Sequence, residues 1–447
     1  MIVVELRRPL GATEEGIWLM DAAASLNFVI VCHVSGALKP DELRQGLDAA
    51  QARHPQLRAR VEELPEGPAF TPVGVGPIPL EVKHLPEQAW VAEAEDQLPL
   101  RFPLAGPYLR ATLLRHDAGL STLLLGFHHV IADGRGAMAL VRDVLTAAAG
   151  ARRGVVTELE PSLDVLPFDA RLPADCFGWR AALRRGVFAL RVLCRSRLWG
   201  PPVRVRRDRE AFAHSRRTRV IPTELKGAQL QRLVDRCRAE ETTVHGALSA
   251  AMLLGILADR AEVNGVSSKV GPVVTMGRPV NQAQRLRPPP GDALGLHVFT
   301  LDYETRLSQS TGFWELARDV HDSLHRGLAR KDDLCMAVLN PKVAGWMGAR
   351  TLDPKQFLEK WEQNAFCTTS LTNLGRTEIP SIYGSLGLEA CRVVSTPSAL
   401  GDFMASAVTL GDTLYWTFLW PDPVLTEEHA QRLTEGIASQ LHRALDL

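Results

Sequence analysis

Apolar runs alternate with amphipathic stretches along the whole chain, which predicts a mixture of strands and helices. In residues 27–36, apolar side chains occupy both alternating sets of positions, as is typical of a strand buried on both faces. Residues 39–55 follow with a helical pattern, with Pro40 at the predicted start and Pro55 beyond the predicted end. A second strongly apolar strand is predicted for residues 119–130.

The pattern weakens in the middle of the chain and then restarts. Residues 157–175 carry three prolines without a clear period, which indicates a connecting segment. Helices are predicted for 222–240, 242–260, 313–330 and 425–445, and strands for 270–281, 294–304, 368–376, 385–396, 403–411 and 413–420. We therefore expect an α/β protein with mixed sheets, in which residues 1–175 and 220–447 form two halves joined by a basic segment, 176–219.

Composition narrows the class of protein. The 447 residues are 46% hydrophobic and 23% charged, which excludes a disordered chain. Lys+Arg and Asp+Glu both number 51, so the net charge is zero and a surface built for nucleic acid is not expected. The seven cysteines stand singly, which argues against a disulfide scaffold or a clustered zinc site and predicts a reducing, cytoplasmic location.

The sequence also gives no sign of a targeting or spanning segment. The first residues lack the order of charged and apolar residues that a secretory signal has. The longest apolar candidate, residues 246–260, is ended by Asp259 and Arg260, and we interpret it as a buried helix.

The neutral total hides a strongly basic stretch. Between Arg180 and Arg219 there are thirteen arginines and two acidic residues. The first half has helical periodicity, and its apolar positions share one face: Leu183, Val187, Leu190, Cys194 and Leu198. Three interpretations stay open: docking of an acidic partner, contact with an anionic membrane surface, or a helix packed on its own protein with solvated arginines.

Two adjacent histidines end the second strong strand. His128 and His129 are expected to point to opposite faces of the strand, so they cannot share one small ligand. Asp133 and Gly134 follow in the turn, where glycine gives conformational freedom. A histidine at the mouth of a strand suits a general base, because its ordinary pKa lies near working pH.

The run HHVIADG, residues 128–134, resembles the HHxxxDG signature of the coenzyme-A-dependent acyltransferase superfamily. This superfamily includes chloramphenicol acetyltransferase, condensation domains of nonribosomal peptide synthetases, plant acyltransferases, wax ester synthases and phthiocerol dimycocerosyl transferases. The HPQLRAR run at 54–60, the strand ending in Arg278 and the SLTNLG element at 370–375 resemble it as well. The dimycocerosyl transferase and condensation branch fits best in length and in the TNLG element, and the plant branch fits worse because its DFGWG motif is absent.

The resemblance implies a fold and a role for each matched residue. Two chloramphenicol-acetyltransferase-like halves would enclose a channel. His129 would be the base, and an ion pair between Asp133 and Arg278 would join the halves. Gly134 would keep the channel open, while His128 would pack or make a hydrogen bond. Candidate donors to the oxyanion, and substrate contacts, are Ser370, Thr372, Asn373 and His128.

The implied reaction moves an acyl group from a thioester, on coenzyme A or a carrier protein, to a hydroxyl or an amine. No acyl-enzyme, metal or redox cofactor is expected, and the partners would be the donor and a small acceptor, with the chain acting as a monomer. Two alternatives are a condensation enzyme that forms an amide and a non-catalytic, carrier-binding member. Because carrier proteins are acidic, Arg204, Arg206 and Arg207 are candidates for a carrier docking site.

Overall fold

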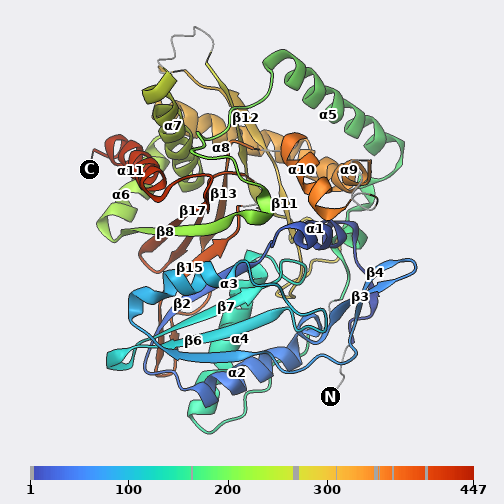
Figure 1. The fold of residues 1–447 in the computed structure, drawn as a ribbon, viewed down its shortest axis with the longest axis vertical. Coiled ribbons are helices and arrows are strands. Elements are labelled where there is room, and N and C mark those ends of the chain that lie inside the picture. Colours follow the sequence, from blue (N-terminus) through green and yellow to red (C-terminus); the bar gives the residue numbers. More distant parts are fainter. Residues whose placement is uncertain are drawn as a thin grey trace.

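The computed structural model describes residues 5–162, 165–264, 271–308, 310–346, 351, 353–364, 367–397 and 401–446. Two six-stranded mixed sheets dominate it, each forming the centre of one lobe (Figure 1). The predicted α/β class with two halves is confirmed. The first residue of the predicted strand 270–281 lies outside the described residues.

The sheet of the first lobe has the order β14-β15-β2-β7-β6-β5. Its strands are β2 (Phe28–Ser35), β5 (Leu80–His84), β6 (Leu109–Arg115), β7 (Ser121–Phe127), β14 (Ile382–Tyr383) and β15 (Leu386–Ser395). Helices α2 (Pro40–Arg53) and α4 (Gly134–Arg152) pack together and share one core with Phe28, Ile30 and Leu125. The opposite face of β2 packs on α3 (Trp90–Gln97) and on strands of the second lobe, because Val29 and Val31 share a cluster with Trp90 and Leu419.

The sheet of the second lobe has the order β12-β9-β13-β16-β17-β8. Its strands are β8 (Arg217–Lys226), β9 (Val273–Gly277), β12 (Tyr303–Arg306), β13 (Thr369–Arg376), β16 (Met404–Leu410) and β17 (Thr413–Asp422). It is accompanied by α6 (Ala228–Ala239), α7 (Val244–Asn264), α8 (Phe313–Ala329) and α11 (Glu427–Ala444). Strand β13 runs parallel to both neighbours, β9 and β16, and the remaining pairs in this sheet are antiparallel.

The remaining elements lie around these two lobes. Strands β1 (Arg8–Pro9), β4 (Gly67–Thr71) and β3 (Arg60–Leu64) form a small sheet, and β10 (Pro279–Asn281) pairs with β11 (Val298–Thr300). The other helices are α1 (Ala12–Ala23), α5 (Gly178–Trp199), α9 (Asp332–Trp346) and α10 (Pro354–Asn364). The amphipathic helix predicted from the arginine-rich stretch is therefore present as α5.

The lobes do not follow the predicted division at residues 175 and 220. Strands β14 and β15 come from the second half of the sequence, yet they extend the sheet of the first lobe. β15 pairs with β2 along eight positions, from Ser395 opposite Phe28 to Gly387 opposite Ser35. β15 thus covers the edge of β2 that β7 leaves open.

Two predicted elements differ locally from the structure. The predicted helix 222–240 begins as strand β8, because residues 217–226 pair with β17, and the helix itself begins at Ala228. The predicted strand 119–130 ends at Phe127, so the two histidines lie in the turn after it rather than on the strand. The predicted strand 294–304 is interrupted between β11 and β12, where the Leu301 N–H donates to the Arg278 carbonyl.

The long apolar helix behaves as a core helix. Residues Val244–Ala261 of α7 are long and apolar enough to cross a membrane, but 56% of this window is buried and α7 packs on α8 and α11. This agrees with the interpretation as a buried helix.

Candidate active site

The site is a tight turn that joins the central strand β7 to helix α4. The His128 N–H donates to the Tyr108 carbonyl, and the Ile131 N–H donates back to the His128 carbonyl, at 3.2 Å. Asp133 then caps α4, since its Oδ1 accepts the N–H groups of Arg135 and Gly136 at 3.0 and 2.9 Å. Such a cap fixes where the helix begins and so fixes the turn in front of it.

His129 is the half-buried imidazole in this turn. Its ring lies 4.9 Å from the Phe28 ring, between centroids. Nδ1 is buried and makes no hydrogen bond within the described residues. Burial lowers the pKa of His129, although the Asp133 carboxylate and backbone groups of the turn partly offset this. The ring is therefore neutral near pH 7 and can accept a proton.

His128 points elsewhere and its ring nitrogens are engaged. Nδ1 accepts the Val130 N–H at 3.1 Å, and Nε2 lies 3.3 Å from the Asp21 carboxylate. The ring also packs on Trp18 and Tyr108, with 5.4 Å between centroids in both cases. Burial alone would raise the pKa of Asp21. The hydrogen bond from His128, together with other contacts, outweighs this effect, so the pKa of Asp21 is lowered. His128 thus anchors the turn to α1.

Asp133 joins the two lobes, but through backbone atoms. Its Oδ2 accepts the His297 N–H at 3.0 Å, and its own N–H donates to the Gly295 carbonyl at 3.0 Å. The predicted ion pair with Arg278 is wrong, because among the described residues Asp133 has no such contact. Three backbone N–H groups satisfy this carboxylate, so it needs no cationic partner.

Arg278 organises the second lobe instead. Its guanidinium is buried and donates to the Val320 carbonyl at 2.9 Å, to Ser323 Oγ at 3.1 Å and to the Leu301 carbonyl at 3.2 Å. Burial lowers the pKa of Arg278 to about 10. The arginine therefore ties β9 to α8 by satisfying carbonyl groups, which an arginine with five N–H donors can do.

Gly134 lies where α4 meets β13. A Cβ atom at this position would come within 2.9 Å of Leu374. The Leu374 side chain would have to move to make room for a larger residue, so the glycine allows a close contact between α4 and β13. Its predicted part in keeping a channel open stays a prediction.

Three of the four predicted oxyanion or substrate residues come from β13, and the fourth, His128, lies in the turn after β7. Alternation along this strand puts Ser370 and Thr372 on one face, and Leu374, at the irregular end of the strand, lies next to Gly134. The Ser370 hydroxyl donates to the Gly277 carbonyl at 3.1 Å, and Asn373 Oδ1 accepts the Gly375 N–H at 2.8 Å. Thr372 is the candidate whose hydroxyl has no hydrogen bond within the described residues.

Sequence reasoning missed the partners that hold the turn. It did not find Phe28 beside His129, Asp21 beside His128, or the Gly295 and His297 backbone groups on Asp133. Of these contacts, only the one with Phe28 could be suspected from the sequence, because Phe28 begins a strongly apolar strand. Backbone donors carry no signal in the sequence at all.

The candidate carrier docking arginines are engaged inside the protein. Arg207 binds both oxygens of Asp402, at 2.8 and 2.7 Å, and also Glu362 at 2.8 Å. Arg204 donates to the Glu362 carbonyl at 2.8 Å, and Arg206 lies 3.5 Å from Asp259. Internal carboxylates therefore take up part of the charge of all three arginines, and their part in carrier docking stays a prediction.

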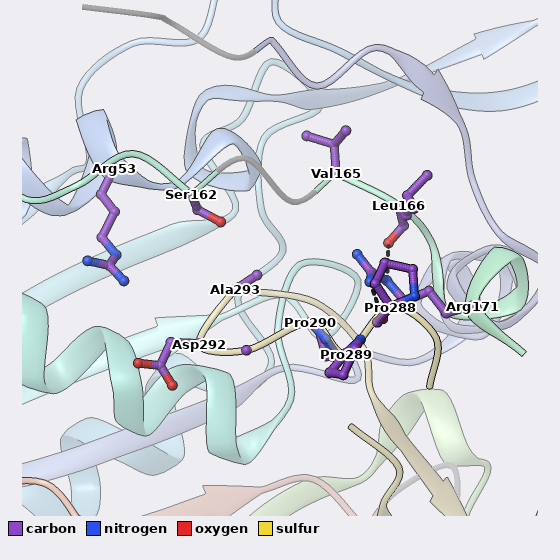
Figure 2. Close-up of a pocket in the computed structure, with 11 residues that line it drawn as sticks. Arg53, Ser162, Val165, Leu166, Arg171, Pro288, Pro289, Pro290, Asp292 and Ala293 are labelled. Atoms are coloured by element: carbon purple, nitrogen blue, oxygen red, sulfur yellow. Dashed lines mark hydrogen bonds between the residues drawn. The ribbon is translucent and has the colours of Figure 1, made fainter. Parts of the chain in front are cut away.

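An open pocket of about 450 Å³ lies near the site but does not include the histidine turn (Figure 2). It is lined by Arg53, Arg171 and the loop 288–293, which leads directly into the Gly295–His297 segment on Asp133. The guanidinium of Arg171 faces this loop and donates to the Pro288 carbonyl at 2.6 Å. Among the described residues no group of three or more His, Cys, Asp or Glu side chains could hold a metal ion.

Solved structures define the class to which this fold belongs. The trichothecene 15-O-acetyltransferase TRI3 of Fusarium sporotrichioides superposes with a TM-score of 0.73 at 14% identity, covering 98% of this chain and 95% of that one. The starter condensation domain of rhizomide synthetase RzmA, in complex with C8-CoA, gives a TM-score of 0.68 at 16% identity, covering 99% and 95%. The chain has the two-lobed fold of the coenzyme-A-dependent acyltransferase superfamily.

The sequence comparisons find similarity to a dimycocerosyl transferase family and to peptide synthetases. Residues 214–419 match the phthiocerol/phthiodiolone dimycocerosyl transferase C-terminus. The phosphinothricin tripeptide synthetase PhsC of Streptomyces viridochromogenes is 26% identical over 347 residues, which is 72% of this chain and 30% of PhsC. The chain spans less than a third of the length of the curated relatives that it matches. These findings confirm the resemblance stated from the sequence.

Proposed function

We propose that the protein is an acyltransferase that moves an acyl group from a thioester to a hydroxyl acceptor, with His129 as general base. The observation that carries the proposal is a neutral, half-buried imidazole in a turn that Asp133 holds to the second lobe. His128 cannot take this role, since its Nδ1 already accepts a backbone N–H and its Nε2 faces Asp21.

The reaction balances without a covalent enzyme intermediate. His129 takes the proton of the acceptor hydroxyl as its oxygen bonds to the thioester carbonyl carbon. The resulting oxyanion collapses, the carbon–sulfur bond breaks, and the leaving thiolate takes the proton back from the imidazolium. Thr372, from β13, would donate a hydrogen bond to the oxyanion.

An acyl thioester is the donor that the similar structures favour, because RzmA's starter condensation domain was solved with C8-CoA. The acceptor is less constrained. TRI3 is an O-acetyltransferase by name, whereas PhsC is a peptide synthetase. A neutral imidazole serves an alcohol or an amine equally, so amide formation is the second candidate. A non-catalytic, carrier-binding protein is the third.

The test is mass spectrometry of products from a panel of acyl-CoA and carrier-bound donors, offered with alcohols and amines. We expect His129→Ala to lower product formation by about 10²- to 10⁴-fold, the usual contribution of a general base. The matched control is His84→Ala, which removes an exposed imidazole from β5. A His129→Ala variant as active as the wild type, or a wild type inactive with every pair, would contradict the proposal.

The pH dependence gives a second test of the same residue. Because burial lowers the pKa of His129, kcat/KM is expected to reach half of its maximum below pH 6.5 and to stay level above pH 7. A half-maximum above pH 7 would show that another group limits the rate. Intact-protein mass measured during turnover should show no acyl adduct.

A further inference from the structure

Helix α5 presents its apolar face to solvent. Within α5 only Ala181 and Phe188 are buried, and they lie on one side of the helix. Trp179, Leu183 and Leu190 lie on the opposite side and are 73%, 63% and 60% exposed. Other exposed apolar residues in and next to α5 are Phe177, Val187, Val192, Leu193 and Leu198. Soluble proteins rarely leave such a continuous patch uncovered unless it binds something.

The position of α5 leaves this face accessible along its length. In Figure 1 the helix stands at the outer edge of the second lobe, and its neighbour on the inner side is α9. Arg191 fastens it there through an ion pair with Asp332 at 2.7 Å. Arg184 and Arg185 donate to carbonyl groups of residues 175 and 176. The attachment therefore uses the inner side and leaves the apolar side free.

Two arginines of α5 add positive charge beside the apolar face. The 22 residues of α5 include six arginines and no acidic residue. Within the described part of the chain, Arg180 and Arg197 form no ion pair, and Arg180 lies over the Trp179 ring at 5.3 Å. A tryptophan and an arginine beside the apolar face of an amphipathic helix are typical of segments that lie in a lipid–water interface.

We propose that α5 docks the protein on an anionic phospholipid surface, with the helix lying in the plane of the membrane. A bilayer supplies an apolar layer and negative charge together, along the roughly 33 Å of a 22-residue helix. A second copy of the chain fits poorly, because pairing two such helices would bring their arginines together without an acidic residue. An acidic protein would need an apolar groove of the same length.

The proposal is independent of acyl transfer, since α5 contributes no residue to the histidine turn. Its test is sedimentation with vesicles of phosphatidylcholine containing about one-third phosphatidylglycerol, compared with phosphatidylcholine alone. We expect binding to the anionic vesicles only, falling as salt is added. The double variant Leu183→Gln/Leu190→Gln should bind at least about tenfold more weakly, because it removes apolar area from the face.

The matched control is Leu104→Gln/Val156→Gln, which changes two apolar residues that are 72% and 81% exposed elsewhere on the surface. It should bind as the wild type does. Both double variants should keep the wild-type melting temperature, because their changed side chains are exposed. No sedimentation of the wild type, or equal loss in both variants, would overturn the proposal.

Depth of insertion gives a second readout. Brominated lipids should quench part of the wild-type fluorescence, and Trp179→Phe should remove that part. If light scattering instead shows that the Leu183→Gln/Leu190→Gln change turns a dimer into a monomer while vesicles do not bind, the face is an interface between copies and the lipid proposal fails. Capture of an acidic protein without vesicle binding would overturn it equally.

Discussion

The two parts of the arginine-rich stretch look alike in sequence and differ completely in the fold. In α5 the arginines border an apolar face that points outward, and few of them meet a carboxylate. In residues 200–216 four of the five arginines meet acidic side chains from distant parts of the chain: Arg204, Arg206, Arg207 and Arg216. Charge density alone therefore does not tell a docking surface from an internal scaffold.

The second part is built around one buried carboxylate. Asp402 is only 2% exposed, and Arg207 binds both of its oxygens. A second carboxylate in the cluster is Glu362 of α10, which accepts hydrogen bonds from Arg207 at 2.8 Å and from Arg216 at 2.7 Å. The cluster fastens the connecting segment to α10 and to the residues before β16. Removing one side of such a buried pair leaves an uncompensated charge.

The largest effect is expected from Arg207→Ala. Because it leaves Asp402 buried without its bidentate partner, we expect a loss of about 3 kcal/mol in the free energy of unfolding of this lobe. Thermal melting and urea unfolding measure it. Arg197→Ala in α5 is the control and should change stability by less than about 0.5 kcal/mol, as exposed positions usually do. Equal losses of stability in the two variants would show that the arginines of α5 and of residues 200–216 do not differ in their structural role.

A smaller, pH-dependent effect is expected at His429, which the same segment contacts. The buried ring lies between Asp259, 3.0 Å from Nε2, and Asp208, 2.9 Å from Nδ1. The hydrogen bond to Asp259 raises the pKa of His429, and Asp208 adds to this against the opposing effect of burial.

A raised folded-state pKa stabilises the protein fully below the unfolded value of about 6.5, and this contribution is lost as pH rises through the folded pKa. We therefore expect the melting temperature of the wild type, relative to His429→Gln, to fall as pH increases from 6 to 9. The corresponding difference in the free energy of unfolding changes by at most about 1.4 kcal/mol per pH unit. A difference that stays constant over this range would show that the ring is not charged at the lower pH.

A third, intermediate effect concerns donor use. Since Arg204 donates to the Glu362 carbonyl and lies near its carboxylate, Arg204→Glu should act through stability. Rates with a carrier-bound donor and with the matching acyl-CoA are then expected to fall in the same proportion, less than about tenfold. A selective loss with the carrier-bound donor would support the docking interpretation for this residue.

The smallest effect is expected from Leu190→Gln alone. This side chain is 60% exposed, so stability should change by less than about 0.5 kcal/mol in either direction. Urea unfolding at neutral pH measures it. A loss of more than about 1 kcal/mol would mean that the outer face of α5 is covered by the protein itself in solution.

Much of the framework could be predicted from the sequence because its periodic signals are strong. The apolar run of residues 27–36 forms β2, the amphipathic run after Pro40 forms α2, and the arginine-rich run forms α5. The HHxxxDG run indicated the turn at His129 and the resemblance to the superfamily whose fold the chain shares. These patterns are local, and a local pattern predicts the structure correctly when tertiary packing favours the same element.

The parts that could not be predicted depend on long-range pairing. The strand 385–396 was found, but nothing in its alternation says that it joins β2 rather than the sheet of its own half. The resemblance implies Arg278 as the partner of Asp133, in line with the usual need of a buried carboxylate for a cation. Backbone N–H groups at 135, 136 and 297 satisfy it instead, and these have no side-chain signature.

The placement of β15 has a consequence for any attempt to divide the protein. A fragment that ends between α4 and α5 would carry β2 with one hydrogen-bonding edge open, and the complementary fragment would carry β15 without a partner. Neither fragment is a complete folding unit, because each contains one strand of the β2–β15 pair. Co-expressed as two polypeptides they should reassemble through that strand pair, whereas each alone should aggregate along its bare edge.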